Sequence, residues 1–137
     1  MAVQVHGMDL KNPLVLKAAA LVAADTASAG VYVGRGWFIV QIIWTACEIA
    51  SSDEFYNVQF QFNTAAADST WLDGPNVAFG DTLLLGGAAD TSATGDMVLA
   101  IFNPYDHQVR VNTWVTGTIA TGFNFAVNAY PMEQGAF

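Results

Sequence analysis

Two histidines, His6 and His107, are the side chains of this sequence whose ordinary pKa best suits acid–base catalysis near neutral pH. Nucleophilic catalysis also needs a nucleophile and a group that orients the base, all within hydrogen-bond reach. His6 lies in a predicted arm and His107 in a predicted turn, and no Gly-x-Ser-x-Gly signature accompanies them. The sequence therefore predicts no enzyme activity and no catalytic residues. An enzyme would need a pocket that gathers His107 with two acids.

The acidic residues form two local groups with different expectations. Asp90 and Asp96 flank hydroxyl residues and a glycine in a loop that could wrap Ca²⁺, but their spacing does not fit the helix-loop-helix calcium motif. A polar loop without metal is favoured, with a calcium site as the alternative. Asp53 and Glu54 are adjacent and point to opposite faces of an extended chain, which predicts a solvated loop between two strands. No metal ligand and no cofactor is predicted.

Cys47 is the only cysteine, so the chain can form neither an intrachain disulfide nor a thiolate metal cage. It shares the strand parity of Ile43 and Ile49, which predicts a buried free thiol, with an intersubunit disulfide as the alternative. Gly34-Arg35-Gly36 lacks the further glycines, the lysine and the helix of a phosphate-binding loop. We expect a tight turn there that leads into a long strand.

The composition favours a protein that packs against others. The 137 residues suffice for one domain; 53% are hydrophobic and only 12% are charged, against about a quarter charged in typical soluble domains. Part of the outer surface must then be apolar or neutral, which marks contact with other proteins. The net charge of −8 and four scattered cations argue against a nucleic-acid partner; the cations are Lys11, Lys17, Arg35 and Arg110.

The apolar run Leu14 to Ala24, followed by Ala27-Ser28-Ala29, has the form of a secretory signal. Asp9 stands where such a signal needs basic residues and Lys17 interrupts the run, so secretion is disfavoured and a reducing compartment is expected. No apolar run approaches the roughly 20 residues of a membrane-spanning helix. Leu14 to Ala24 fits either a short helix or an edge strand, and we predict an extended arm followed by a strand for residues 1–30.

The remaining chain is rich in Gly, Thr, Asn and Val, and turn residues recur at the short intervals of a β-sandwich or barrel. Trp37 to Ile49 is apolar on both parities, as in a central strand covered on both faces or lying at a subunit contact. Alternation or flanking turn residues predict further strands at Phe55 to Asn63, Thr82 to Leu85, Met97 to Phe102, Val109 to Val115 and Phe123 to Tyr130. The stretch around Asp73-Gly74-Pro75-Asn76 is expected to be a loop. The predicted organisation is one β-sandwich domain over residues 31–131 and a tail over 132–137.

Four tryptophans suggest a second kind of site, because rings on a β-sandwich can form the flat platform on which sugars stack. Trp37, Trp44 and Trp114 sit in or beside predicted strands at apolar parities, where packing is the commoner role. Trp71 is expected to be the most exposed ring, because turn residues surround it. A carbohydrate-binding β-sandwich module, from a tail fibre or a surface protein, is the alternative function.

Glu48 and Arg110 are charged residues inside strand patterns. Charges in such positions most often find a partner at the rim of a domain or at an interface, where they set register more than they add stability. Both residues are therefore candidates for positioning subunits against each other.

The last third of the chain combines hydrophobic-Arg-hydrophobic-Asn in an alternating strand with Thr-Gly-Thr and a closing strand. The residues are Gln108-Val109-Arg110-Val111-Asn112-Thr113-Trp114-Val115-Thr116-Gly117-Thr118, Ala120-Thr121-Gly122-Phe123-Asn124-Phe125-Ala126-Val127 and Ala129-Tyr130. This pattern resembles the terminal hairpin of tailed-bacteriophage capsid cement (head decoration) proteins of the small β-sandwich trimer type. Val33-Gly34-Arg35-Gly36 leading into Trp37 to Thr45, followed by Val58 to Phe62, is similar to the family's first hairpin. The resemblance covers roughly half of the residues, and Ala65 to Gly95 has no counterpart.

The resemblance implies a jelly-roll-like β-sandwich that assembles as a homotrimer on the outer capsid surface of a virion and bridges neighbouring major capsid proteins. The expected function is that of a structural cement which stabilises this lattice after synthesis in the host cytoplasm. The expected partners are the major capsid protein and copies of the chain itself, with no nucleic acid and no membrane. The interface candidates are Arg35, Glu48, Arg110, Asn112, Trp114 and Tyr130.

Overall fold

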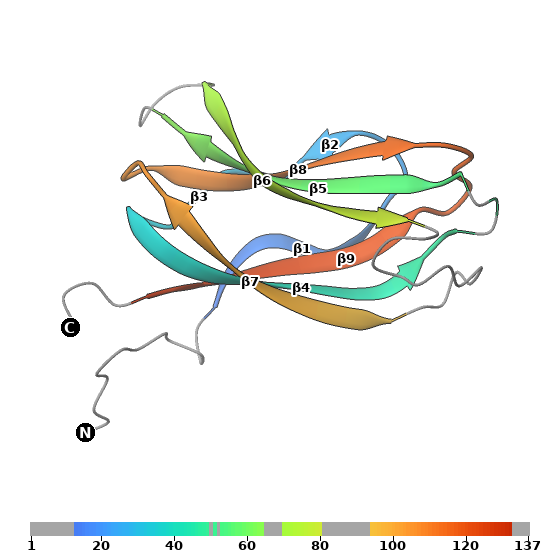
Figure 1. The fold of residues 1–137 in the computed structure, drawn as a ribbon, viewed down its shortest axis with the longest axis horizontal. Coiled ribbons are helices and arrows are strands. Elements are labelled where there is room, and N and C mark those ends of the chain that lie inside the picture. Colours follow the sequence, from blue (N-terminus) through green and yellow to red (C-terminus); the bar gives the residue numbers. More distant parts are fainter. Residues whose placement is uncertain (1–12, 50, 52, 65–69, 81–93, 133–137) are drawn as a thin grey trace.

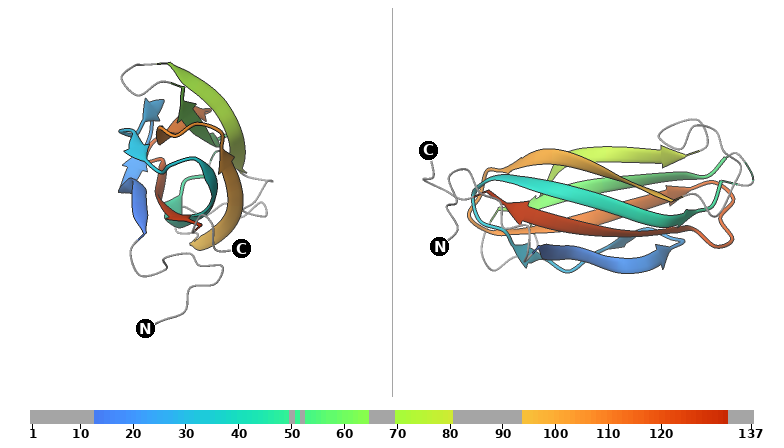
Figure 2. Two further views of the ribbon diagram at one scale, coloured as in Figure 1. Left: turned by 90° about the vertical axis from the view of Figure 1, so that its left-hand side faces the viewer. Right: turned by 90° about the horizontal axis from the view of Figure 1, so that it is seen from below.

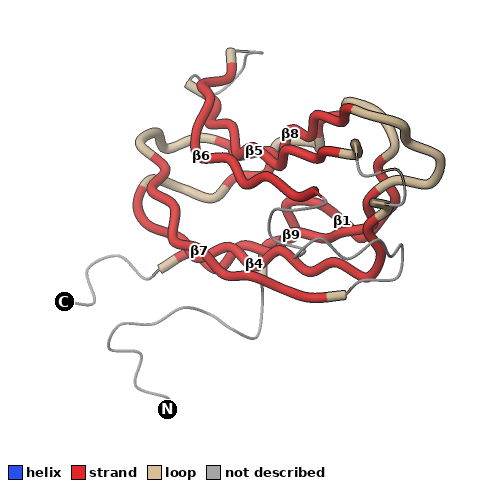
Figure 3. The backbone as a smooth tube through the Cα atoms, turned by 45° about the vertical axis from the view of Figure 1, so that its right-hand side comes forward, coloured by secondary structure: helices blue, strands red, loops and turns tan. Residues whose placement is uncertain are grey.

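The computed structural model describes residues 13–49, 51, 53–64, 70–80 and 94–132, and every regular element within them is a β-strand (Figure 3). The strands are β1 (Leu14–Val22), β2 (Thr26–Ala27), β3 (Val31–Tyr32), β4 (Gly36–Cys47), β5 (Phe55–Asn63), β6 (Trp71–Gly80), β7 (Gly95–Asn103), β8 (Gln108–Thr116) and β9 (Phe123–Pro131). The predicted all-β fold class is confirmed.

The strands form two antiparallel sheets that face each other (Figures 1 and 2). Sheet I has the order β1-β9-β4-β7, and sheet II has the order β2-β8-β5-β6, with β3 also paired to β8. Most connections therefore pass from one sheet to the other, and strands far apart in sequence become neighbours. This strand order is that of a double-sheet jelly roll, so the predicted jelly-roll-like β-sandwich is confirmed.

The hydrophobic core lies between the two sheets because alternate residues of each strand point inward. The central strands β4 and β9 of sheet I face β5 and β8 of sheet II across this core. Their inward side chains are almost fully buried, and they include Phe38, Val40, Ile42, Phe123, Phe125, Val127, Tyr56, Val58, Phe60, Val109 and Val111. The alternation read from β5, β8 and β9 thus identified the inward residues of these strands correctly.

The first part of the chain is built into the sandwich more fully than predicted. Leu14 to Ala24 contains the edge strand β1 and not a helix, and β1 and β2 belong to sheets I and II. The sandwich therefore begins at Leu14, and the predicted boundary at residue 30 does not separate it from an arm. Residues 1–12 of the predicted arm, the predicted strand Thr82 to Leu85 and residues 133–137 of the tail lie outside the described residues.

Strand β6 replaces a predicted loop. The pairing of β5 with β6 shifts register between Gln59 and Gln61, which places Gly74-Pro75 in a β-bulge opposite Phe60. Because β6 is the edge strand of sheet II, the missing N–H of proline costs no inner ladder bond. Glycine is required beside it, since a Cβ on Gly74 would lie 2.5 Å from the Phe62 ring. The prediction of a loop around Asp73-Gly74-Pro75-Asn76 is therefore wrong, because the glycine and proline form a bulge within a strand.

A second bulge sits in β4, where the pairing with β9 shifts register between Trp44 and Ala46. The shift changes the parity of the strand, so Ile43 faces outward while Cys47 and Ile49 face the core. Cys47 is a fully buried free thiol, as predicted, although it does not share the face of Ile43. Burial, followed by the charges of Glu54 and Glu48, raises the pKa of this thiol to about 12.

Candidate functional site

The outer face of sheet I is apolar. Strand register places Trp37 beside Phe102, and Ile39 between Ala100 and Tyr130. We call this set the apolar face: Trp37, Ile39, Ile43, Val98, Ala100, Phe102, Ala126 and Tyr130. Trp37, Val98 and Phe102 are 54%, 60% and 42% exposed. The rings of Trp37 and Phe102 meet edge to face with centroids 5.4 Å apart, so these two exposed aromatic rings of the face form a cluster.

Three polar groups on the outer face of sheet I bond to one another. Gln41 Nε2 donates to Asp96 Oδ2 at 3.2 Å, and the Tyr130 hydroxyl donates to Gln41 Oε1 at 3.3 Å. Asp96 is the only charged residue in β4, β7 or β9. This explains why Trp37 to Ile49 is apolar on both faces. Side chains of one parity fill the core, and side chains of the other parity are partly exposed in the part of the chain that the structure describes.

The outer face of sheet II is polar and rich in amides. Register places Gln61 between Arg110 and Asp73, and Gln59 between Asn112 and Asn76. We call this set the polar face: Asn57, Gln59, Gln61, Trp71, Asp73, Asn76, Arg110, Asn112 and Trp114. It lies on the opposite side of the sandwich from the apolar face, because each sheet has one face on the common core (Figure 1).

Hydrogen bonds connect three strands across the polar face. Arg110 Nε donates to Gln61 Oε1 at 2.8 Å, and Gln61 Nε2 donates to Asp73 Oδ1 at 2.8 Å. The guanidinium carbon of Arg110 also lies 4.3 Å from the centroid of the Trp71 ring. Arg110 therefore has two intrachain partners, which fix its position.

The exposure of the tryptophans differs from the prediction. Trp71, expected to be the most exposed, is partly buried and has Arg110 over its ring, while Trp37 and Trp114 are more exposed. The prediction for Trp71 is wrong because the turn residues around it belong to strand β6. Trp44 is buried and packs against Phe79 and Phe123, as predicted for a ring in a strand.

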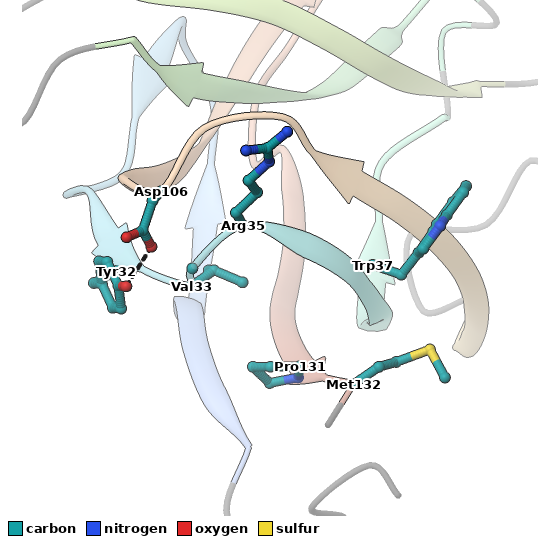
Figure 4. A pocket seen from close by; sticks show the side chains of 8 residues that line it. Tyr32, Val33, Arg35, Trp37, Asp106, Pro131 and Met132 are labelled. Carbon is teal, nitrogen blue, oxygen red and sulfur yellow. Dashed lines mark hydrogen bonds between the residues drawn. The ribbon is translucent and has the colours of Figure 1, made fainter. Parts of the chain in front are cut away.

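Arg35 lies at one end of the sandwich, in the turn between β3 and β4. Positive φ angles of 86° at Gly34 and 124° at Gly36 confirm the predicted tight turn. Arg35 lines a pocket of about 530 Å³ with Tyr32, Trp37, Asp106, Pro131 and Met132 (Figure 4). The Tyr32 hydroxyl donates to Asp106 Oδ1, and the Arg35 guanidinium points away from that pair (Figure 4). This pocket is separate from both sheet faces, although Trp37 borders it.

At the other end of β4, carboxylates join two turns. Glu48 is 6% exposed, and its carboxylate accepts the backbone N–H groups of Ala120 at 2.8 Å, Thr121 at 2.7 Å and Gly122 at 2.9 Å. Burial raises the pKa of Glu48, but the N–H donors, beginning with Gly122, outweigh it and leave the pKa below the ordinary value. The partner of Glu48 within the chain is therefore the β8–β9 turn.

Asp53 and Glu54 lie in the predicted loop between β4 and β5, where Asp53 is exposed, but Glu54 is not solvated as was predicted. Asp53 Oδ1 accepts the Thr118 N–H at 3.0 Å and Oδ2 accepts its hydroxyl at 2.8 Å, and these bonds lower the pKa of Asp53. Glu54 is buried and accepts the N–H groups of Ser51 and Asp53. The prediction for Glu54 fails because the β4–β5 turn folds back around its carboxylate, where backbone donors replace water.

We expect Glu48→Gln to lower Tm by about 5 °C or more near neutral pH, because a neutral amide holds the three N–H donors less strongly. The depressed folded-state pKa of Glu48 and Asp53 gives the sign of the pH dependence. Their stabilisation is present above the unfolded-state pKa and is lost as pH falls below about 4. Denaturant unfolding at neutral and acidic pH should show a smaller acid-induced loss for the variant. An equal loss would contradict a charged role for Glu48.

Lys17 lines a second, smaller pocket, of about 250 Å³, between β1 and the edge of sheet II. Its Nζ donates to the carbonyl oxygens of Phe125 at 2.6 Å, Ala18 at 3.2 Å and Ala20 at 3.3 Å. Burial lowers the pKa of Lys17 to about 8. The register of β1 with β9 shifts on both sides of Lys17, so the ammonium group satisfies carbonyls of an irregular strand. Its role is structural.

No family model and no curated protein matches this chain. The described part of the chain contains no helix capable of spanning a membrane. Among the described residues, no three His, Cys, Asp or Glu side chains gather in a way that could hold a metal ion. Asp96 belongs to β7, while Asp90 lies outside the described residues.

The structure distributes the six interface candidates over four places. Tyr130 lies on the apolar face, whereas Arg110, Asn112 and Trp114 share the polar face. Arg35 lines the end pocket and Glu48 is internal. His107 lies in the β7–β8 turn and is not among the residues that line the neighbouring pocket. The outward residues Trp37, Val98 and Phe102 were not selected from the sequence, although the double-sided apolar pattern of β4 pointed to one part of this face.

Proposed function

We propose that this protein is a structural capsid cement, or decoration, protein that binds the outer surface of a phage head as a homotrimer and stabilises the major capsid protein lattice. The observation that carries the proposal is the apolar face, exposed on a chain with few charges. The jelly-roll sandwich and the resemblance of the β8–β9 hairpin to this family also support it. The mechanism involves no turnover and no cofactor.

The apolar face suits protein contact because burying it against another surface is favourable. Each Å² of apolar surface removed from water stabilises a complex by roughly 25 cal/mol, before the costs of association. Aromatic residues such as Trp37 and Phe102 are those that most often dominate the centre of an interface. A protein that binds only the assembled lattice favours assembly by mass action, and contacts repeated around a three-fold axis act together through effective concentration.

Phage heads that lack this protein are expected to release DNA at a lower temperature, and adding the purified chain should restore their resistance. The double variant Trp37→Asp/Phe102→Asp should be retained on heads at least about tenfold more weakly, because two charges would then be desolvated in the contact. Trp114→Asp places the same change on the opposite sheet and serves as the control. Heads that are equally heat-resistant with and without the protein would contradict the proposal.

Solution mass gives a second readout of the same proposal. Light scattering after size-exclusion chromatography should give the unsubstituted protein a mass about three times the chain mass of 14.6 kDa. An unsubstituted protein that stays monomeric at every concentration that allows head binding would overturn the homotrimer. Retention on heads, measured separately, would still decide the capsid-binding part.

A further inference from the structure

The polar face of sheet II has features that the proposed assembly role does not require. We propose that this face is a binding site for a neutral, hydroxyl-rich glycan chain. The proposal goes beyond the cement function and does not rest on it, since it concerns the opposite side of the sandwich. It rests on an unpaired buried acceptor, on an ordered Arg–Gln–Asp chain and on the exposed ring of Trp114.

The unpaired acceptor is Gln59 Oε1, in the middle of the polar face. Gln59 is 7% exposed and lies between Asn112 on β8 and Asn76 on β6. Its Nε2 reaches the Gly74 carbonyl at 3.5 Å, but Oε1 has no hydrogen-bond donor among the described residues. A buried polar atom without a partner destabilises the free protein, and a donor that reaches this atom removes that cost. A ligand hydroxyl is such a donor, and it can also accept from the neighbouring amides.

The Arg110–Gln61–Asp73 chain supplies both hydrogen-bond donors and hydrogen-bond acceptors at fixed positions. Arg110 uses Nε on Gln61, and its other N–H groups have no acceptor within the described part of the chain. Asp73 is exposed and uses Oδ1 on the same amide. Because Trp71 and Gln61 hold Arg110, little side-chain entropy remains to be lost on binding. Adjacent hydroxyl groups of a sugar, which both donate and accept, match such a pair.

Trp114 supplies the stacking surface at the far end of the same strip. It is 36% exposed and points outward from β8, four residues after Arg110. At about 3.4 Å per residue the two side chains stand roughly 14 Å apart along the strand, with Asn112 between them. An oligosaccharide of several rings spans that length. The apolar C–H faces of its rings can pack on the indole while its hydroxyls meet the amides.

Charge favours a neutral glycan over other ligands. Arg110 and Asp73 balance each other on the polar face, and the remaining members of the set are amides and tryptophans. A polyanion would meet a chain with a net charge of −8, and one arginine offers little compensation. A protein partner is a poorer match, because the fully buried centre of a protein interface is apolar, as on the opposite sheet.

The test is an array that holds neutral oligosaccharides of glucose, galactose, mannose and rhamnose beside sulfated and sialylated ones. The strongest neutral binder is then titrated by calorimetry against the full chain and its variants. Trp114→Ala and Asn112→Ala should each weaken binding at least about tenfold. The matched control is Trp37→Ala, which removes an exposed tryptophan from the apolar face and should leave the affinity unchanged.

The Gln59→Leu variant tests whether the Gln59 amide contacts the ligand or has only a structural role. It preserves the approximate volume and removes the unpaired acceptor, so Tm should stay the same or rise while glycan affinity falls. The proposal is overturned if no neutral oligosaccharide binds, if hits are confined to anionic glycans, or if Trp37→Ala weakens binding as much as Trp114→Ala. Protection of phage heads by Trp114→Ala is measured in parallel, so failure here is distinguishable from failure of the cement function.

Discussion

Gly122→Ala is expected to be among the most damaging single substitutions in the chain, with a loss of about 3 kcal/mol or more in the free energy of unfolding. Gly122 has a φ of +100°, a conformation that costs alanine roughly 1–2 kcal/mol. The added Cβ would also lie 2.3 Å from the Val22 carbonyl oxygen and 2.8 Å from its carbon, so backbone must move. That movement would disturb the Gly122 N–H bond to Glu48. Urea unfolding monitored by circular dichroism measures the loss.

Gly34→Ala provides the matched control for Gly122→Ala. Gly34 also has a positive φ, of +86°, but the nearest atom to its added Cβ, the Tyr32 hydroxyl oxygen, is 3.7 Å away. This variant should therefore lose only the conformational part, about 1–2 kcal/mol. The difference between the two variants isolates the backbone overlap at Gly122. Equal losses at the two positions would contradict the close packing of the β8–β9 turn against the end of β1.

Phe123→Ala is expected to lower the free energy of unfolding by about 3–5 kcal/mol, and Tm by about 10–20 °C. The Phe123 ring is fully buried in an aromatic cluster at one end of the core. Its centroid lies 4.7 Å from that of Phe125, 4.8 Å from Phe79 and 5.2 Å from Tyr56. Removing it creates a cavity between rings that belong to both sheets. Thermal and urea unfolding of the purified variant measure the effect.

Phe123→Leu is the graded comparison, because leucine refills most of that space. It should lose well under half of the stability that alanine loses, since a large hydrophobic side chain of similar volume is retained. The apolar face and the polar face are the outer faces of the two sheets and do not include this buried cluster, so both variants should keep the proposed binding under conditions in which they remain folded. A loss for leucine as large as that for alanine would show that ring geometry, and not volume, holds this end of the core.

Local alternation was sufficient to predict most strands. Phe55–Asn63 has the bounds that were predicted, and the inward residues of β8 and β9 follow the expected parity. Alternation works there because each of these strands has one face on the core. It failed at β6, where Gly74-Pro75 has the sequence of a turn and the structure of an edge-strand bulge. Bulge and turn use the same residues, and only the partner strand distinguishes them.

Charged residues inside strands were harder to interpret from the sequence. Glu48 and Arg110 were both expected to find partners at the rim of the domain or at an interface; within the chain, Glu48 binds the β8–β9 turn and Arg110 binds Gln61 and lies over Trp71. Thr121 is 73 residues away from Glu48 in the sequence, and Gln61 and Trp71 are 49 and 39 residues away from Arg110. Hydrogen-bond partners at such separations are chosen by topology, which no local pattern contains.

The sequence by itself determined that this is an all-β chain with one core, few charges and more apolar surface than the core can hold, because composition and alternation are local properties. Only the tertiary structure decided where on the surface the apolar residues outside the core lie. The jelly-roll order brings the outward residues of β4, β7 and β9 together as an apolar face, and gathers the amides of β5, β6 and β8 on the opposite side. Which strands become neighbours depends on long-range pairing, and so does the chemistry of each face.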